Sequence, residues 1–256
     1  MILIFFIFGL VIGSFLNVCI YRIPRHKSIV NPSRSFCPNC LKPIEAYDNI
    51  PVLSYILLGG KCRNCKKHIS WQYPLVELLT GILFLCLYLK FGMTLPLLIN
   101  IVFISLLIIA AFTDLTHRII PNAISVPGIL VGLILNYQNI LNIRSGDNVI
   151  TGTLVSAGIL WIFRQIGLLI KKQEMMGWGD IKLAGMIGAF LGIGHGVLAL
   201  FLGVFLGVVI WTILIILKLK TRKEYIPFGA FLALGSIFAV FFGNEIIIWY
   251  LKLFKF

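Results

Sequence analysis

Six side chains in this sequence are the main candidates for catalysis and metal binding. Two are aspartates, Asp114 and Asp180, and each lies at the edge of a long apolar run. Four are cysteines in two CxxC pairs that 21 residues separate: Cys37, Cys40, Cys62 and Cys65. Paired carboxylates can act as a general base and a general acid. Two CxxC pairs can hold one metal ion between four thiolates.

The two aspartates lie at the edge of apolar segments, where an ionised side chain is energetically unfavourable. Asp114 closes the apolar run that starts at Leu95, and Asp180 opens the run 181–217. Twenty residues of helix cover about 30 Å, which puts Asp114 at the inner edge of the hydrocarbon layer. Asp180 reaches a similar depth if the chain turns back at 192–196. Two carboxylates in one desolvated site tend to share a proton, and this supplies the base and the acid of an aspartic-type peptidase.

Simpler roles for the aspartates remain open on the sequence alone. Asp180 can cap a helix N-terminus, and Asp114 can end a helix and pair with Arg118. Gly177 and Gly179 permit the close approach of another chain, which an extended peptide substrate needs. A proton-coupled transporter, with the two acids as a relay, is a second hypothesis. A non-catalytic scaffold that binds a partner through its cysteine pairs is a third.

The cysteine pattern favours a structural zinc site. Each CxxC can wrap a tight knuckle around a metal, and two knuckles complete a tetrahedral shell with no open position for water or substrate. Two disulfides are the alternative, but the charge distribution places this loop in the reducing cytoplasm, where disulfides are rare. A loop of about 50 residues is too small for a large core, so a metal would stabilise it.

The elements that must position these residues are membrane helices. The chain of 256 residues is 59% hydrophobic and 12% charged, and its mean hydropathy is +1.01. Apolar runs of about 20 residues are long enough to cross a bilayer, which predicts an all-α polytopic membrane protein. About eight transmembrane helices are expected, at 1–21, 74–90, 95–113, 121–136, 149–170, 176–193, 197–217 and 226–250.

The net charge of +13 is explained by membrane topology, so no nucleic-acid partner is expected. If segment 22–73 is cytoplasmic and the chain changes side at each span, eighteen of the 22 basic residues fall inside and four outside. This is the positive-inside pattern. The first helix lacks a basic region ahead of its apolar stretch, so we expect it to be retained with its N-terminus outside. The expected parts are the first helix at 1–21, a cytoplasmic zinc-binding module at 22–73 and a helical peptidase domain at 74–256.

Several segments, taken in order, resemble the type IV prepilin peptidases, which are membrane aspartic peptidases of the GxGD type. These segments are GSFLNVCIYRIP (13–24), the CxxC pairs, DNIPVLSY (48–55), ISWQYPLVELLTG (69–81), TDLTHRIIPN (113–122), MGWGDIKLAGMIGAFLG (176–192) and IPFGAFLALG (226–235). The resemblance implies that Asp114 and Asp180 are the catalytic pair. It also implies that the substrates are prepilins or pseudopilins, which lose a short basic leader at the cytoplasmic face of the bacterial inner membrane.

Members of this family with a four-cysteine module also methylate the newly exposed amino group with S-adenosylmethionine, and the resemblance implies the same activity here. No GxGxxG motif follows a strand, so no motif locates the methylation site. Glu45, Asn49 and Glu77 are candidates for lining it, because they are polar positions within the matching segments. A solvated loop charge, a turn residue and an interfacial carboxylate are the respective alternatives.

Overall fold

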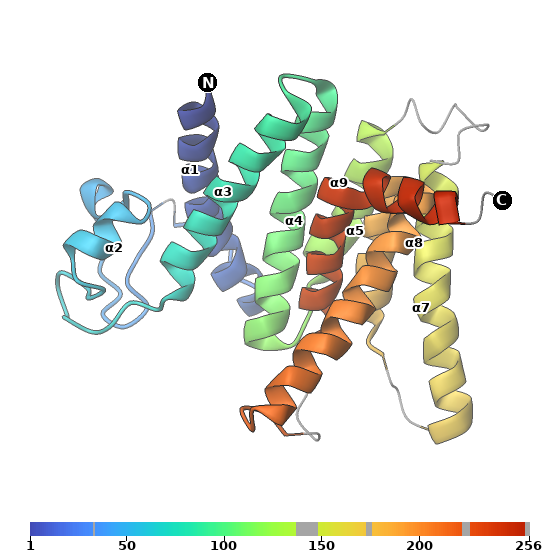
Figure 1. The fold of residues 1–256 in the computed structure, drawn as a ribbon. Coiled ribbons are helices and arrows are strands. Elements are labelled where there is room, and N and C mark those ends of the chain that lie inside the picture. The colour runs from blue at the N-terminus through green and yellow to red at the C-terminus, as the bar shows by residue number, and fades with distance from the viewer. Residues whose placement is uncertain (33, 137–147, 173–175, 222–225, 254–256) are drawn as a thin grey trace. The chain divides into compact units, whose positions relative to one another are not determined.

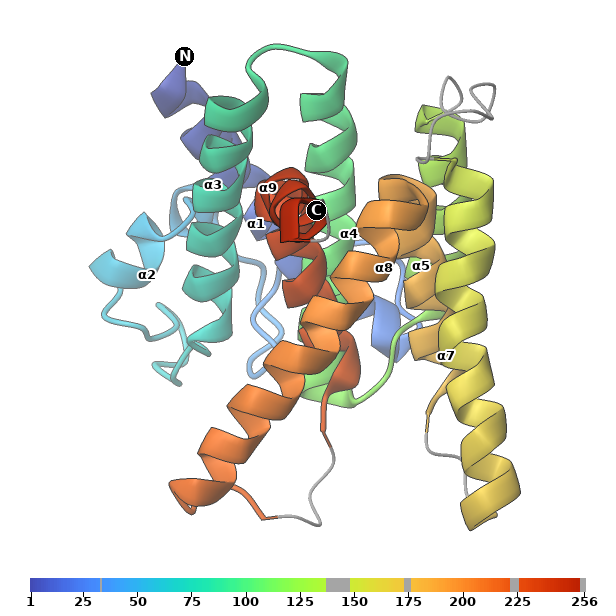
Figure 2. The ribbon, with the colours of Figure 1, turned by 45° about the vertical axis from the view of Figure 1, so that its right-hand side comes forward.

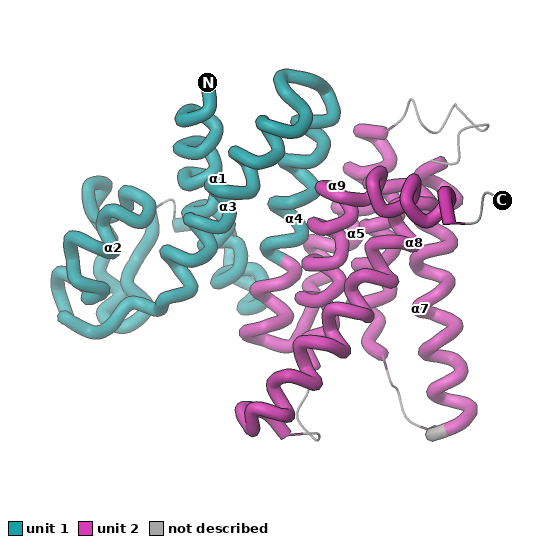
Figure 3. Tube along the Cα trace, viewed as in Figure 1, with its two compact units in different colours: residues 1–109 teal, residues 110–256 magenta. Residues whose placement is uncertain are grey.

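The secondary structure is helical apart from two isolated β-bridges (Figure 1). The computed structural model describes residues 1–256 except 33, 137–147, 173–175, 222–225 and 254–256. The helices are α1 (Ile2–Arg22), η1 (Ile23–Arg25), η2 (Ala46–Asn49), α2 (Leu53–Leu57), α3 (Gln72–Phe91), α4 (Leu95–His117), α5 (Asn122–Leu135), α7 (Val149–Lys171), α8 (Trp178–Ile216) and α9 (Phe228–Leu253). They form two compact units, unit 1 at 1–109 and unit 2 at 110–256, and α4 runs from one into the other (Figure 3).

Among the described residues, six helices are long and apolar enough to cross a membrane: α1, α3, α4, α7, α8 and α9. The protein is therefore a multi-pass helical membrane protein. Helix α5 is apolar but has only 14 residues. The eight crossings expected from the sequence stay a prediction, because α5 is short and α8 joins two of the expected spans.

Helix α8 contains the turn that the sequence predicts. Its 39 residues cover both 176–193 and 197–217, and the helical backbone breaks at Gly192, with φ 72° and ψ −172°. This positive φ suits a residue without a side chain. A Cβ on Gly196 would lie 3.3 Å from the Cα of Gly188, so the chain doubles back here and α8 consists of two legs.

Close helix contacts hold each unit together. In unit 1, α1 lies along α3 (Figures 1 and 2), and a Cβ on Gly13 would lie 2.7 Å from the Cα of Glu77. In unit 2, α7 packs on the first leg of α8, where Gly152 and Gly188 meet. Small residues at such crossings let membrane helices approach until their backbones touch.

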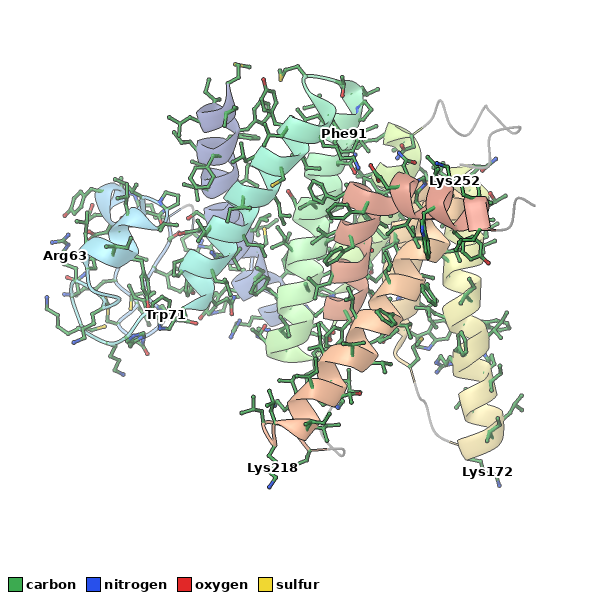
Figure 4. All side chains as sticks on the ribbon, viewed as in Figure 1. Arg63, Trp71, Phe91, Lys172, Lys218 and Lys252 are labelled. Carbon is green, nitrogen blue, oxygen red and sulfur yellow. The ribbon has the colours of Figure 1, made fainter. Side chains whose placement is uncertain are left out.

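Lysines lie at both ends of the unit 2 helices. Lys172 follows α7 and Lys218 follows α8, and both lie at the same end of the unit, whereas Lys252 in α9 lies toward the opposite end (Figure 4). The predicted topology puts Lys172 and Lys218 inside and Lys252 outside. Within unit 2, Lys172 and Lys218 are separated from Lys252 in the same way.

We expect Gly188→Ala to destabilise the protein, because a Cβ at this position would collide with the Gly152 carbonyl on α7. Overpacking of this kind costs about 1–3 kcal/mol. Gly158→Ala on α7 is the matched control, since a Cβ on Gly158 meets no atom within 4 Å. Melting temperatures of both variants in the same detergent test this, and an equal drop for the two would contradict the packing.

Candidate active site and metal centre

Both predicted aspartates are buried in unit 2. Asp114 lies in the last turn of α4 with 1% of its surface exposed, and Asp180 lies in the first turn of α8 with 7% exposed. The carboxylate of Asp114 is near enough to act electrostatically on Asp180. The fold of this unit therefore gathers two acidic residues that are 66 positions apart in the chain (180 − 114).

Each carboxylate accepts a hydrogen bond from a backbone N–H at the start of a helix. The N–H of Ala230, the third residue of α9, donates to Oδ2 of Asp114 at 3.3 Å. The N–H of Gly177, the residue before α8, donates to Oδ2 of Asp180 at 3.3 Å. The first N–H groups of a helix have no partner within it and carry partial positive charge. Two helix N-termini thus stabilise negative charge on either carboxylate, and Asp180 makes the capping contact that its simpler role predicts.

Ile120 packs between the two helix starts. A Cβ on Gly179 would lie 3.0 Å from the Cβ of Ile120. A Cβ on Gly229 would lie 2.7 Å from Cδ1 of Ile120 and 3.1 Å from Oδ2 of Asp114. Gly179 and Gly229 therefore serve the close approach of Ile120 and Asp114.

The two glycines ahead of Asp180 have different surroundings. Among the described residues, and apart from its chain neighbours, a Cβ on Gly177 would meet only Oδ2 of Asp180, at 3.4 Å, and the nitrogen of Gly179, at 3.9 Å. The expectation that both glycines leave room for another chain therefore fits Gly177. It does not fit Gly179, because the side chain of Ile120 already occupies that space.

Two further contacts hold the start of α8. The guanidinium of Arg164 on α7 lies 4.7 Å from the ring centroid of Trp178. Nζ of Lys182 donates to Oδ1 of Asn122 at 2.8 Å. Sequence reasoning gave no role to Arg164 or Ile120. The only signal was that Ile120 and Trp178 lie within segments already singled out.

The four predicted metal ligands come together in unit 1. Their Sγ atoms all lie within 4.8 Å of one another, and the Sγ atoms of Cys37 and Cys65 are 3.9 Å apart. A tetrahedral site with Zn–S bonds of about 2.3 Å has its sulfurs about 3.8 Å apart. All six cysteines of the chain are free thiols. The cluster can therefore hold a metal ion, and its dimensions fit zinc.

The two knuckles share one backbone design. In each, the N–H of the first cysteine donates to a carbonyl five residues later: Cys37 to Lys42 at 3.0 Å, and Cys62 to Lys67 at 2.9 Å. The residue after the second cysteine has a positive φ, 59° at Leu41 and 57° at Lys66. A β-bridge closes each knuckle, Phe36 with Pro43 and Lys61 with His68. The module is thus built from two equivalent halves, each presenting two thiols.

The thiols of the two knuckles differ in acidity. Burial raises the pKa of the Cys37 thiol to about 11. The backbone N–H groups of Cys65 and Asn64 lower the pKa of the Cys62 thiol to about 7. Because metals bind thiolates, loading this cluster at neutral pH would release protons.

An ion pair lies beside the second knuckle. Nε and one terminal nitrogen of Arg63 each donate to Asp48 at 2.7 Å, and Arg63 lies on the surface of the module (Figure 4). Hydrogen bonds from Arg63 lower the pKa of Asp48. The resulting stabilisation is complete above the ordinary aspartate pKa of about 3.9 and is lost as the pH falls through the lowered value. It is therefore constant between about pH 5 and 8, and small because Arg63 is exposed.

The three candidates for the methylation site lie in unit 1 in different settings. Glu45 precedes η2 and Asn49 ends it, and both are exposed. Glu77 on α3 is 8% exposed, and its Oε2 accepts the N–H of Val52 at 2.8 Å. The structure thus brings the Glu77 carboxylate into contact with the backbone of Val52, three residues after Asn49.

Two family models match the chain, one in its N-terminal part and one in the part that follows. Residues 7–91 match the Bacterial Peptidase A24 N-terminal domain, and residues 101–213 match the Type IV leader peptidase family. No solved structure matches the chain.

Three similar proteins are each named prepilin leader peptidase/N-methyltransferase. The one from Bacillus subtilis is 36% identical over 253 residues, 99% of each chain. The one from Legionella pneumophila is 34% identical over 267 residues, 96% of this chain and 92% of its own. The one from Myxococcus xanthus is 42% identical over 186 residues, 73% of this chain and 55% of its own. These matches confirm the resemblance seen in the sequence, and the chain belongs to the type IV leader peptidase family.

Proposed function

We propose that this chain is an aspartic endopeptidase of the membrane that removes the short basic leader from type IV prepilins or pseudopilins. It then methylates the new N-terminal residue with S-adenosylmethionine as the methyl donor. The observation that carries the proposal is the burial of Asp114 and Asp180 at two helix starts, in a chain of the leader peptidase family.

Asp114 and Asp180 are the catalytic residues of this proposal. One carboxylate, ionised, takes a proton from a water molecule as the water attacks the scissile carbonyl. The other, protonated, gives its proton to the departing amine. The N–H groups of Ala230 and Gly177 each hold one carboxylate oxygen, so both side chains are oriented before the substrate arrives.

The reaction takes place at the cytoplasmic face of the bacterial inner membrane, in a chain that crosses it about eight times with its N-terminus outside. The excess of basic residues on one side supports this orientation. Asp114 lies three residues before the end of α4, or about 4.5 Å along the helix axis. That depth suits a substrate whose leader is cytoplasmic and whose apolar stretch stays in the membrane.

The division of the chain follows the chemistry. The first helix (1–21) leads into the cytoplasmic module (22–73), where Cys37, Cys40, Cys62 and Cys65 hold zinc, and segment 74–256 forms the peptidase domain. Zinc with four thiolates has no open position, so it ties the knuckles together and takes no part in cleavage. S-adenosylmethionine supplies an electrophilic methyl group when bound, and Glu45, Asn49 and Glu77 line its site.

Asp114→Asn and Asp180→Asn should each lower leader cleavage by at least ~100-fold, since an amide can neither take nor give the proton. Asparagine keeps the size of the side chain and an oxygen for the backbone N–H, so the fold should survive. The measurement is the cleavage rate of a purified prepilin in detergent. Glu245→Gln, an equally mild change at an exposed acid of α9, should cleave normally. Wild-type rates from either aspartate variant would refute the catalytic pair.

The purified protein should contain about one zinc ion per chain. Cys37→Ser and Cys62→Ser should lose it, because each removes one of four ligands. Cys86→Ser, a thiol in α3 outside the cluster, should keep it. Elemental analysis by mass spectrometry measures the content. Metal-free protein with its cysteines joined in disulfides would contradict both the zinc site and the cytoplasmic position of the module.

A further inference from the structure

Unit 1 contains a buried polar cluster that the peptidase chemistry does not use. Asn17 on α1 is 3% exposed and Glu77 on α3 is 8% exposed. Nδ2 of Asn17 donates to the carbonyl of Tyr73 at 3.0 Å, and Gly13, the residue before Ser14, lies against the backbone of Glu77. Residues three or four apart lie on one face of a helix. Ser14 and Asn17 therefore face Tyr73 and Glu77 across the helix pair.

The cluster has more acceptors than donors. Oδ1 of Asn17 is buried and has no hydrogen-bond partner within the part of the chain that the structure describes. Buried polar atoms in proteins almost always have a partner, so an orphan acceptor points to a missing donor. Glu77 accepts the N–H of Val52, yet a carboxylate offers about four acceptor sites. Asn17 contacts Tyr73, which lies one helical turn from Glu77 on α3. An unpaired amide oxygen and a carboxylate in one cluster suit a ligand that is positively charged and carries several N–H donors.

Backbone strain marks the same place. Val52, whose N–H binds Glu77, has φ 62° and ψ −49°. A branched side chain is strongly disfavoured at positive φ. Strain of this kind persists where the surrounding structure enforces it, and it gathers at functional sites. Here it fixes the Glu77 carboxylate to the module.

Asn17, Glu77 and Asp114 each lie within two turns of one end of their own helix. Asn17 lies five residues before the end of α1, and Glu77 lies five residues after the start of α3, each about 7.5 Å along the axis. Asp114 lies about 4.5 Å from the end of α4. The predicted topology puts all three helix ends on the same side of the membrane.

We infer that Asn17 and Glu77 bind an ammonium group of a methyl-transfer reactant, an inference that rests on the proposed methylation. Two reactants carry such a group: the cleaved pilin, through its new N-terminus, and S-adenosylmethionine, through its amino-acid part. In either case an N–H of the ligand donates to Oδ1 of Asn17, and the Glu77 carboxylate balances the charge. Where the ligand is the pilin, its ammonium gives one proton to the Glu77 carboxylate before the nitrogen takes the methyl group from the donor's sulfonium. This makes Asn17 a binding residue for methylation and leaves leader cleavage to unit 2.

The experiment compares Asn17→Leu and Asn17→Asp with the wild type. Each purified protein is given a prepilin and S-adenosylmethionine, and mass spectrometry measures the methylated fraction of the cleaved product. This ratio is independent of the cleavage rate. Asn17→Leu should lower it at least 10-fold. Asn17→Asp keeps acceptor oxygens but loses the N–H that the Tyr73 carbonyl accepts, so it should lower the ratio less than Asn17→Leu does.

Thr80→Val is the matched control at the same helix contact. Thr80 is fully buried against Gly13, and its hydroxyl already donates to the Val76 carbonyl of its own helix. It should methylate normally. An equal loss in Thr80→Val and Asn17→Leu would show a packing defect and overturn the inference.

Two binding measurements identify the reactant. If the ammonium belongs to the methyl donor, Asn17→Leu weakens binding of S-adenosylhomocysteine in equilibrium dialysis. If it belongs to the pilin, the KM for pre-cleaved pilin rises and that dissociation constant is unchanged. Wild-type values for both quantities would overturn the inference. A wild-type enzyme that cleaves but never methylates would refute the methylation proposal itself.

Discussion

Two carboxylates buried in an apolar helical unit need compensation, and much of unit 2 supplies it. A charge at membrane depth is costly unless polar groups face it. Asp114 and Asp180 receive backbone N–H groups from the starts of α9 and α8, where such groups are otherwise unpaired. These donors belong to the backbone, so they cannot rotate away. Moving either helix start would leave a buried acid without its partner, which makes the path of the chain at 177 and 229 part of the site.

Glycines allow the backbone to follow this path at the two helix starts. Ile120 fills the space beside Gly179 and Gly229, and it brings the end of α4 and the two helix starts into one packed group. Farther along α8, Gly188 lies against Gly152, and Gly192 reverses the chain. Without a strong hydrophobic drive between helices inside a membrane, close packing of this kind has to provide the stability. The same residues that stabilise unit 2 thus set the position of its acids.

The sequence was informative where a pattern is local. Apolar runs predicted the helices, the GIGHG stretch predicted the reversal in α8, and the spacing of Cys37, Cys40, Cys62 and Cys65 predicted one cluster. The neighbours of the acids could not be predicted in this way. Ala230 binds Asp114 through its backbone, which no residue type reveals, and Ile120 is an ordinary apolar residue until the fold places it. The orphan oxygen of Asn17 likewise emerges only from the packing of α1 on α3.

The repeated knuckles determine how a metal would be captured. Each CxxC turn holds its two sulfurs in position before a metal binds. An ion bound by one cysteine pair therefore needs only the second pair to complete its four ligands. When both cysteine pairs bind one ion, they close a loop of chain. The conformational entropy lost on closure rises only with the logarithm of the loop length. The intervening stretch can therefore lengthen or shorten at little thermodynamic penalty. That stretch carries Val52, whose N–H binds Glu77, so the same loop also joins the cysteine module to α3.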